Sequence, residues 1–358
     1  MKPVARNDYV LVESEADPSF ADPSFYQLDV FEEVQTWVGR DANRFYISVF
    51  KEIEKCTTLT GFTFYLAFHV PDRLPEYNDK VVLVTLLDED YKHRGYFNDI
   101  RCVIRCLGPR PVYKDGFPTN PLKATALLHY FYKLSRHFGI ILRDIRKSRR
   151  FTVSRVRRKT LHVPLGVFSH FNPDLRPIAE REIDYAFLGS VGFIQLSRTQ
   201  KWIHRLLSPP KIQARRAMLG ALQRLPEQYK GKIYATGDML ESIKNRDEYV
   251  QTLSNTKISL CPRGTSYETF RFFESCKAGC IVICEPLPDV WFYKEHPGIV
   301  INDWSRLPEI IEHVLEDRAL LTARFAETLA YWDKVVSERA IAIRVAQFVE
   351  ASQPARLS

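Results

Sequence analysis

Residues 256–286 read TKISLCPRGTSYETFRFFESCKAGCIVICEP, and this stretch decides the fold. The apolar run at 258–261 is typical of a short buried strand, and the Pro-Arg-Gly that follows breaks that strand into a loop. Apolar residues at helical spacing predict a helix over 268–278, which Gly279 ends as a left-handed stop. The apolar run at 280–284 supplies the next buried strand. The stretch therefore predicts strand, glycine loop, helix and strand, the repeating unit of an α/β sheet.

The charged residues of the predicted helix fall on one face. Glu268, Arg271 and Glu274 are three residues apart, away from the stripe that holds Phe273 and Cys276. A surface crossover in which the arginine and the glutamate pair with each other would also explain this spacing, for a few tenths of a kcal/mol. Open α/β sheets bind ligands at the carboxyl ends of their strands, where this loop and helix lie, and we therefore favour a binding site.

A sugar nucleotide suits the chemistry of this site. A diphosphate needs backbone N–H groups, a positive helix end and a cationic fork. The groups that offer these are Arg263, Gly264, Thr265, Ser266 and Arg271. Glu274 lies one turn deeper on the same face as Arg271, and we expect its carboxylate to accept hydrogen bonds from the ribose hydroxyls. Glu268 or Thr269, at the helix start, should lie near the donor sugar.

The same stretch resembles the signature of the exostosin-type glycosyltransferases. In that family a Cys-Pro-Arg-Gly loop precedes a helix with Ser/Thr-x-Arg-x-x-Glu and then Ala-Gly-Cys-Ile, which here are residues 261–264, 269–274 and 278–281. Weaker similarity extends backward, so that roughly residues 160–305 are covered. The resemblance implies a GT-B fold, with two Rossmann-like domains facing a cleft and the donor nucleotide in the C-terminal one. It also implies inverting sugar transfer, UDP as the carrier ahead of GDP, and no metal in the nucleotide site.

The pattern of the whole chain agrees with an α/β protein of this kind. Strands alternate with helices in both halves of the 358 residues, enough for two domains. We predict a weakly ordered N-terminal arm over 1–28, a Rossmann-like acceptor domain over 29–165, and a nucleotide-sugar-binding domain over 166–334. The last segment, 335–358, is predicted as a helix that returns to the first domain.

An acidic turn in the first domain offers a candidate base. The predicted strand 81–87 ends at Asp88, Glu89 and Asp90. One of these carboxylates could take the proton from the acceptor hydroxyl while the nucleotide diphosphate leaves, and crowding should raise at least one pKa toward a useful range. An exposed turn that caps the next segment is the plain alternative. The same residues also spell Asp-x-Asp, which in a metal-dependent transferase would bind a divalent cation.

Further contacts to the donor phosphates are predicted from the start of the second domain. Gly189 and Ser190 follow a strand and should form a loop of small residues beside the phosphates. Lys201 and Arg205 come soon after and could neutralise the leaving diphosphate, although their helical spacing suits an exposed polar face nearly as well.

Charge indicates the class of partner. The formal net charge is +8, and residues 143–159 hold nine Arg or Lys against one Asp. This basic segment could hold an acidic glycan, a lipid-linked saccharide acceptor or an anionic membrane surface. A solvated linker is the alternative interpretation. No nucleic-acid-binding motif accompanies the charge, so nucleic acid is not predicted as a partner.

Cysteine usage and hydropathy suggest a reducing compartment. The seven cysteines form neither a disulfide framework nor a paired C-x-x-C zinc pattern, and we predict no structural metal. No apolar run is long enough to span a bilayer, and the first residues do not form a signal peptide. Animal exostosins carry a membrane anchor, so we expect a cytoplasmic relative of bacterial type, which could be held peripherally at the membrane. The predicted function is transfer of a sugar from a nucleotide sugar to a glycan or lipid-linked acceptor. A catalytically silent carbohydrate-binding or scaffold protein with the same fold is the alternative.

Overall fold

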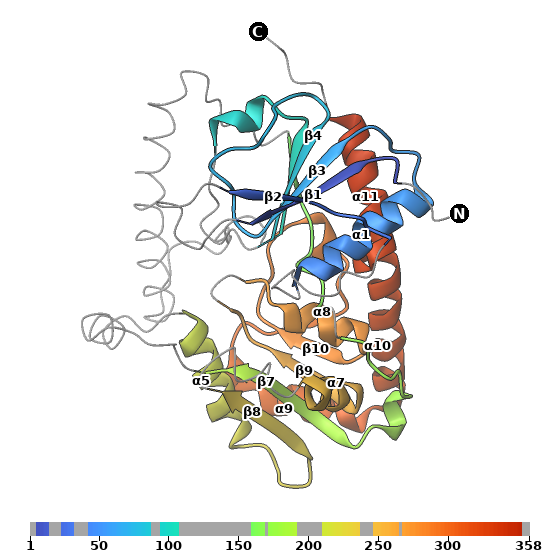
Figure 1. The fold of residues 1–358 in the computed structure, drawn as a ribbon. Coiled ribbons are helices and arrows are strands. Elements are labelled where there is room, and N and C mark those ends of the chain that lie inside the picture. Colours follow the sequence, from blue (N-terminus) through green and yellow to red (C-terminus); the bar gives the residue numbers. More distant parts are fainter. Residues whose placement is uncertain are drawn as a thin grey trace, which may run out of the picture. The chain divides into compact units, whose positions relative to one another are not determined.

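The computed structural model describes residues 5–13, 23–31, 42–86, 94–106, 159–168, 171–191, 210–236, 246–264 and 267–352. They divide into two units, each built on its own sheet (Figure 1). The first unit holds the described residues up to 106, together with 159–168 and 335–352, and the second holds 171–334. Because both sheets are largely parallel and carry helices, the predicted α/β class with two Rossmann-like domains is confirmed. None of the helices in the described ranges combines the length and the apolar character needed to cross a lipid bilayer.

The sheet of the first unit has six strands. Their spatial order is β2 (Ser24–Gln27), β1 (Asp8–Glu13), β3 (Thr63–Ala67), β4 (Val81–Thr85), β5 (Cys102–Arg105) and β6 (Thr160–His162). Each pair of neighbours is parallel, except that β2 runs antiparallel to β1. The parallel strands β1 and β3–β6 therefore follow one another in chain order across the sheet.

The N-terminal residues correct one prediction. Residues 8–13 and 24–27 were expected in a weakly ordered arm, but they form β1 and β2 of the first sheet. The run Tyr9-Val10-Leu11-Val12 is apolar enough to be buried on both faces, and Tyr9 is fully buried between Phe50 and Phe64. The prolines nearby led the sequence interpretation toward a loop, but tertiary packing of this short apolar run outweighs them.

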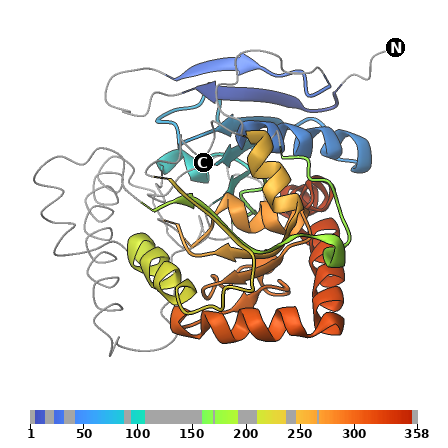
Figure 2. The same cartoon turned by 90° about the horizontal axis from the view of Figure 1, so that it is seen from below.

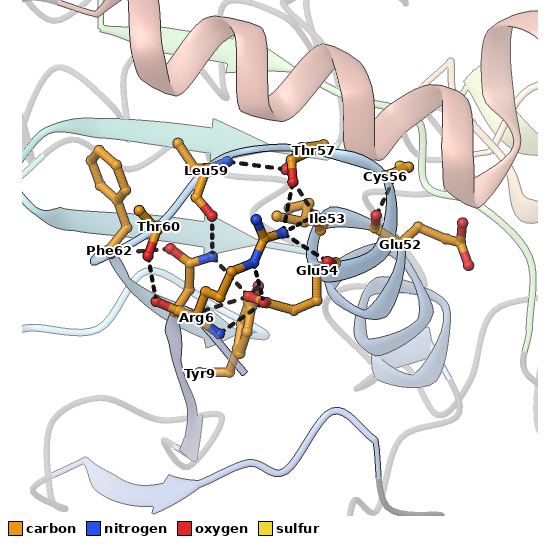
Figure 3. A network of polar contacts seen from close by, with 11 residues as sticks. Arg6, Tyr9, Glu52, Ile53, Glu54, Cys56, Thr57, Leu59, Thr60 and Phe62 are labelled. Carbon is orange, nitrogen blue, oxygen red and sulfur yellow. Dashed lines mark hydrogen bonds and ion pairs between the residues drawn. The ribbon is translucent and has the colours of Figure 1, made fainter. Parts of the chain in front are cut away.

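A polar network ties the start of β1 to the helix α1 (Ala42–Cys56), as Figure 3 shows. The Glu54 carboxylate is 2% exposed and accepts hydrogen bonds from the backbone N–H of Arg6 at 2.8 Å and from the Asn7 side chain at 2.7 Å. The Tyr9 hydroxyl donates to the same carboxylate at 2.8 Å. Although burial by itself raises the pKa of Glu54, these hydrogen bonds bring that pKa below its ordinary value. Several donors bind this buried carboxylate at once, so its hydrogen-bonding capacity is used within the fold.

The last helix belongs to the first unit. α11 (Glu338–Ala351) packs against α1, and the two lie side by side in Figure 1. Arg101, just before β5, donates to the backbone oxygens of Val349 and Glu350, which closes the end of α11. A π-helical turn at Trp332–Val336 precedes α11, and the chain passes from the second unit to the first there.

The second sheet is fully parallel. Its spatial order is β11 (Ile299–Val300), β10 (Ile281–Cys284), β9 (Thr256–Cys261), β7 (Ile183–Ser190) and β8 (Gly231–Thr236). In chain order this is a 2-1-3-4-5 arrangement, the doubly wound order in which the strand sequence reverses between the first and third strands. The reversal here lies between β7 and β9.

Helices cover both faces of this sheet (Figures 1 and 2). They are α5 (Pro210–Leu222), α7 (Arg246–Ser254), α8 (Phe270–Lys277), α9 (Leu307–Glu316) and α10 (Arg318–Tyr331). Apolar residues of α5, α9 and the start of α10 share one core with strand residues such as Phe187, Leu260 and Ile283. α7 and α8 pack on the opposite face, where the hydroxyl of Ser275 donates to Ser259 of β9 at 2.7 Å.

One buried arginine fastens the amino ends of these strands. Arg181 stands two residues before β7 and is 2% exposed. Its guanidinium donates to the backbone oxygens of Arg176, Thr256 and Ala278, and to the Cys280 sulfur. Five hydrogen bonds occupy its five N–H groups, so the amino edge of the sheet is held by a satisfied cation.

Candidate functional site

The order of the second sheet marks one place where a ligand should bind. In doubly wound sheets the helices after the two strands at the reversal lie on opposite faces, and a crevice opens at the carboxyl ends of those strands. The strands at the reversal here are β7 and β9, which end at Ser190 and Cys261. Charged side chains from α5, α8 and the segments after β9 and β10 gather at this carboxyl edge.

Arg271 of α8 reaches across to the end of β7. Its Nε donates to the backbone oxygen of Leu188 at 2.5 Å, and its guanidinium lies over the Phe187 ring, 4.8 Å from the centroid. Gly189 makes this approach possible, because a Cβ at that position would overlap with the guanidinium. Arg271 is only 9% exposed, which excludes the alternative of an arginine on a solvated crossover helix.

A second arginine, Arg215 of α5, reaches the same strand end. It is 4% exposed, donates to the backbone oxygen of Ser190, and lies 5.7 Å from the Phe187 centroid. Lys211, one turn earlier, donates to the Ser190 hydroxyl at 3.0 Å. Burial, and next the positive charge of Arg271, lower the pKa of Arg215 to about 9, so its guanidinium stays charged at neutral pH.

The segment after β9 adds a third arginine and a carboxylate. The guanidinium of Arg263 stacks on Tyr267, 3.8 Å from the ring centroid. The backbone N–H of Arg263 donates to Glu285, which directly follows β10, at 2.9 Å. Arg263 and Arg215 both act electrostatically on the Glu285 carboxyl, which shows that α5, β9 and β10 bring these groups to one place.

These three arginines share one further feature, which is a buried nitrogen that no described residue accepts a hydrogen bond from. The Nε atoms of Arg215 and Arg263 and the Nη1 atom of Arg271 have no hydrogen-bond partner among the described residues. A buried donor without a partner costs about 1–3 kcal/mol, so such groups are rare unless a ligand or an ion meets them. With Lys211 the cluster holds four cations, against the carboxylates Glu274 and Glu285, which leaves two positive charges in excess. We refer to Lys211, Arg215, Arg263 and Arg271 as the arginine cluster, and its chemistry is that of an anion site.

Glu274 lies about one helical turn beyond Arg271 on α8. Its carboxylate is 1% exposed and accepts a hydrogen bond of 2.5 Å from the Tyr249 hydroxyl of α7. The Tyr249 ring meets Phe171 edge to face. Burial, and next the negative charge of Glu274, raise the pKa of Tyr249 well above its ordinary value, so the phenol remains a donor. Tyr249 therefore fixes the orientation of Glu274.

Glu268 and Thr269 precede the helix instead of opening it, because α8 begins at Phe270. Thr269 occupies the N-cap position without a side-chain cap hydrogen bond. Glu268 is 4% exposed, and its charge acts on the hydroxyls of Tyr293 and Tyr331. Glu268 therefore belongs to an aromatic environment at the start of α8.

The structure places part of the predicted site. Gly189, Ser190, Arg263 and Arg271 meet at the carboxyl edge, with Gly264 next to Arg263 in the chain and Glu274 one helical turn beyond Arg271. The remaining predicted residues lie outside the described ranges, and they are Asp88, Glu89, Asp90, Lys201, Arg205, Thr265 and Ser266. Their roles stay predictions. The basic segment also lies outside these ranges, except Lys159, whose ammonium donates to the backbone oxygens of Asn98 and Ile100 and is buried. No three potential metal ligands converge within the described part of the chain.

Sequence reasoning missed Arg215, Tyr249 and Glu285. A signal for Arg215 was present, because it lies three residues after Ile212 and three before Met218, both buried. That spacing puts the arginine on the apolar stripe of α5, whereas the next residue, Arg216, is exposed. Tyr249 and Glu285 carried no comparable signal, since their partners come from other elements of the fold.

Comparison with known proteins adds a weak likeness. No protein-family model matches the chain, and no curated protein matches it. Solved structures similar to it include a chain from the structure of accessory secretory protein 1, 2 and 3 in Streptococcus pneumoniae, at 13% identity and a TM-score of 0.43, covering 85% of this chain and 56% of that one. Anabaena HepE, whose structure contains UDP and glucose, has 10% identity and a TM-score of 0.41, with coverage of 89% and 98%. WaaG, a glycosyltransferase of lipopolysaccharide biosynthesis, has 12% identity and a TM-score of 0.37, with coverage of 87% and 96%. These TM-scores lie below 0.5, and the function of the protein is therefore inferred from the residues of the site itself.

Proposed function

We propose that this protein is a glycosyltransferase that takes its sugar from a nucleotide-sugar donor held by the second unit. The observation that carries the proposal is the arginine cluster at the reversal of the second sheet, with three buried donors that lack partners among the described residues. An anion with several oxygens satisfies such donors, and a diphosphate matches an excess of two positive charges. The surrounding sequence, with its Cys-Pro-Arg-Gly and Thr-x-Arg-x-x-Glu elements, supports the same assignment.

The cluster would act on the leaving group. As the bond between sugar and diphosphate breaks, negative charge grows on the diphosphate oxygens, and fixed guanidinium donors in a buried site stabilise that charge. Arg271 and Arg215 are already held against the backbone of β7, so they need little reorganisation. Glu274, oriented by Tyr249, would accept hydrogen bonds from the ribose hydroxyls.

The finer parts of the proposal concern donor, acceptor and mechanism. We propose UDP as the carrier, a glycan or lipid-linked saccharide as acceptor, and inverting transfer in a GT-B arrangement without a metal. One of Asp88, Glu89 and Asp90 would act as the base. The basic segment 143–159 would hold an acidic acceptor or the surface of an anionic membrane on its cytoplasmic side.

Nucleotide binding tests the site. Isothermal titration calorimetry with UDP, GDP and CMP should show binding of a nucleoside diphosphate by the wild type. Arg271→Ala and Arg215→Ala should each weaken it by roughly a hundredfold, because each removes a charged hydrogen-bonding partner of the ligand. Arg216→Ala is the matched control, since it removes an exposed arginine from the neighbouring position of the same helix. Equal effects at positions 215 and 216 would refute the assignment.

Turnover tests the reaction. Release of free nucleoside diphosphate from a nucleotide sugar, followed with and without acceptor glycans, separates an enzyme from a silent carbohydrate-binding or scaffold protein. Amide substitution of the proposed base among Asp88, Glu89 and Asp90 should abolish transfer and spare nucleotide affinity. Loss of activity in a chelator, restored by a divalent cation, would instead favour the metal-dependent Asp-x-Asp alternative.

A further inference from the structure

Glu285 occupies an unusual position for a carboxylate, because it stands within the arginine cluster. It directly follows β10, and its Oε2 atom accepts the backbone N–H of Arg263 at 2.9 Å. That N–H opens the loop that the sequence assigns to the phosphates. The residue is therefore an anion that the chain itself supplies at the site of a proposed anionic ligand.

We propose that Glu285 competes internally with the donor diphosphate for the arginine cluster and so sets the affinity of the site and its dependence on pH. The inference rests on the proposed function and concerns the same site. When it is ionised, this carboxylate lowers the positive charge that the diphosphate meets. It also neutralises part of the repulsion among the arginines when no ligand is bound, which helps the cluster to assemble.

The titratable and charged groups that face Glu285 come from three elements. Arg263 approaches from the segment after β9, Arg215 from α5, and the Cys284 thiol from β10 itself. Burial raises the pKa of Glu285 above its ordinary value, against the lowering effects of Arg263, then of Arg215 and of the Trp304 side chain. The carboxyl is thus neutral at low pH, where it competes little, and ionised above its raised pKa, where it competes fully.

Substitution by glutamine isolates the charge. Glu285→Gln keeps an oxygen that can accept the Arg263 N–H, so the loop should keep its conformation, while the negative charge is lost. The control is Asp184→Asn, which neutralises a partly buried carboxylate at the opposite end of the same sheet. Asp184 is bound there by Lys257 at 2.7 Å and by the backbone N–H of Lys230 at 2.9 Å.

The experiment measures affinity for inorganic pyrophosphate and for UDP by calorimetry across a range of pH. Both ligands titrate, but the ratio of the affinities of Glu285→Gln and wild type cancels their protonation. We expect this ratio to be near one at the acid end and to rise to about tenfold above the pKa of Glu285, as unit charges in a partly screened site require. The Asp184→Asn ratio should stay near one throughout.

Every other outcome rejects either the competition inference or the proposed function. If the wild type binds pyrophosphate and Glu285→Gln, still folded by circular dichroism, binds it equally or more weakly at the alkaline end of the range, the competition inference is wrong and the proposed function stands. A ratio that is above one but independent of pH would also overturn it, because the carboxyl would then act through geometry. If the wild type binds neither pyrophosphate nor any nucleoside diphosphate, the proposed function fails first.

Discussion

The two ends of the second sheet use the same residue in opposite ways. At the amino end, Arg181 is 2% exposed and donates its five N–H groups to backbone oxygens and one sulfur. At the carboxyl end, Arg271 and Arg215 are similarly buried, but each keeps an N–H group without a partner among the described residues. Arg181 holds strands together and has all its donors bound, and we call such an arginine closed. Arg271 and Arg215 each have a donor that no described residue binds, and we call them open.

The difference separates structural from functional burial. A buried guanidinium is expensive to desolvate, and the fold recovers that free energy only when every donor is bound. The network around Glu54 in the first unit follows the closed pattern too, with several donors on one carboxylate. Burial of charge therefore does not mark a binding site by itself. Burial combined with unused donors does, and within the described residues the arginine cluster joins three such arginines.

The largest expected effect is on stability, and it should differ between the closed and the open arginines. Arg181→Ala should lower the free energy of unfolding by about 3–5 kcal/mol, because backbone oxygens from several elements lose their donor. Arg271→Ala should lower it by about 1 kcal/mol or less, since it removes few bonds that the fold itself uses. Urea unfolding without ligand measures both. Similar losses in the two variants would mean that Arg271 is a structural residue and that the distinction fails.

The sequence predicted the elements of the second unit well, for a physical reason. Each strand of its parallel sheet is buried on both faces and reads as a short apolar run, and the helices between them keep a 3.6-residue period. The predicted strands at 258–261 and 280–284 and the predicted helix over 268–278 appear as β9, β10 and α8. In the first unit the short run at β1 was hidden by its proline-containing neighbours.

The candidate site was predictable only where its residues are close in sequence. Arg271 and Glu274 stand out because a loop, a helix start and a strand surround them within one short stretch. Glu285 and Tyr249 acquire their roles from partners on other elements, Arg263 and Glu274, which the topology of the sheet brings near. Local periodicity contains no information about such pairs.

The first sheet has its own arginine at a carboxyl edge, and it yields a prediction on pH. Arg105 ends β5 and is in register with His162 of β6. Burial, and next the Arg105 charge, lower the pKa of His162 to about 4. The unfolded chain therefore binds a proton between about pH 6.5 and about pH 4 that the folded chain does not, so stability falls as pH falls through that window.

Relative to His162→Gln, which cannot titrate there, the wild type should lose up to about 3 kcal/mol of unfolding free energy between about pH 7 and about pH 4. Urea unfolding at intervals of pH measures the difference between the two proteins, in which the contributions of unchanged carboxylates cancel. A difference that does not depend on pH would show that His162 accepts a proton in the folded state, and that the edge of the first sheet tolerates a second positive charge.

Removal of the Tyr249 hydroxyl tests whether the Glu274 carboxylate has a structural role or binds a ligand. Tyr249→Phe removes the donor at 2.5 Å and leaves a carboxylate oxygen buried, which should lower the free energy of unfolding by about 1–3 kcal/mol. The control is Tyr229→Phe, whose hydroxyl donates to Glu316 at the surface, and no measurable loss is expected there. Saturating nucleoside diphosphate should restore part of the Tyr249→Phe loss, because ribose hydroxyls would replace the phenol as donors. If ligand restores nothing beyond what it gives the wild type, Glu274 is a structural residue.

Gly189 gives the mildest test, since it moves one open arginine without removing it. A Cβ at position 189 would overlap with the tip of the Arg271 side chain, so Gly189→Ala should displace that guanidinium from β7 while the backbone keeps its strand. We expect about a tenfold loss of affinity for a nucleoside diphosphate, or about 1.4 kcal/mol, with little change in stability. Gly220→Ala on α5 is the control, because a Cβ there meets nothing within 4 Å. The comparison predicts a definite sign as well as a size. Displacing a closed arginine in this way would lower stability and leave affinity unchanged. If the Gly189→Ala protein unfolds more easily but binds the nucleotide normally, Arg271 is a structural residue like Arg181.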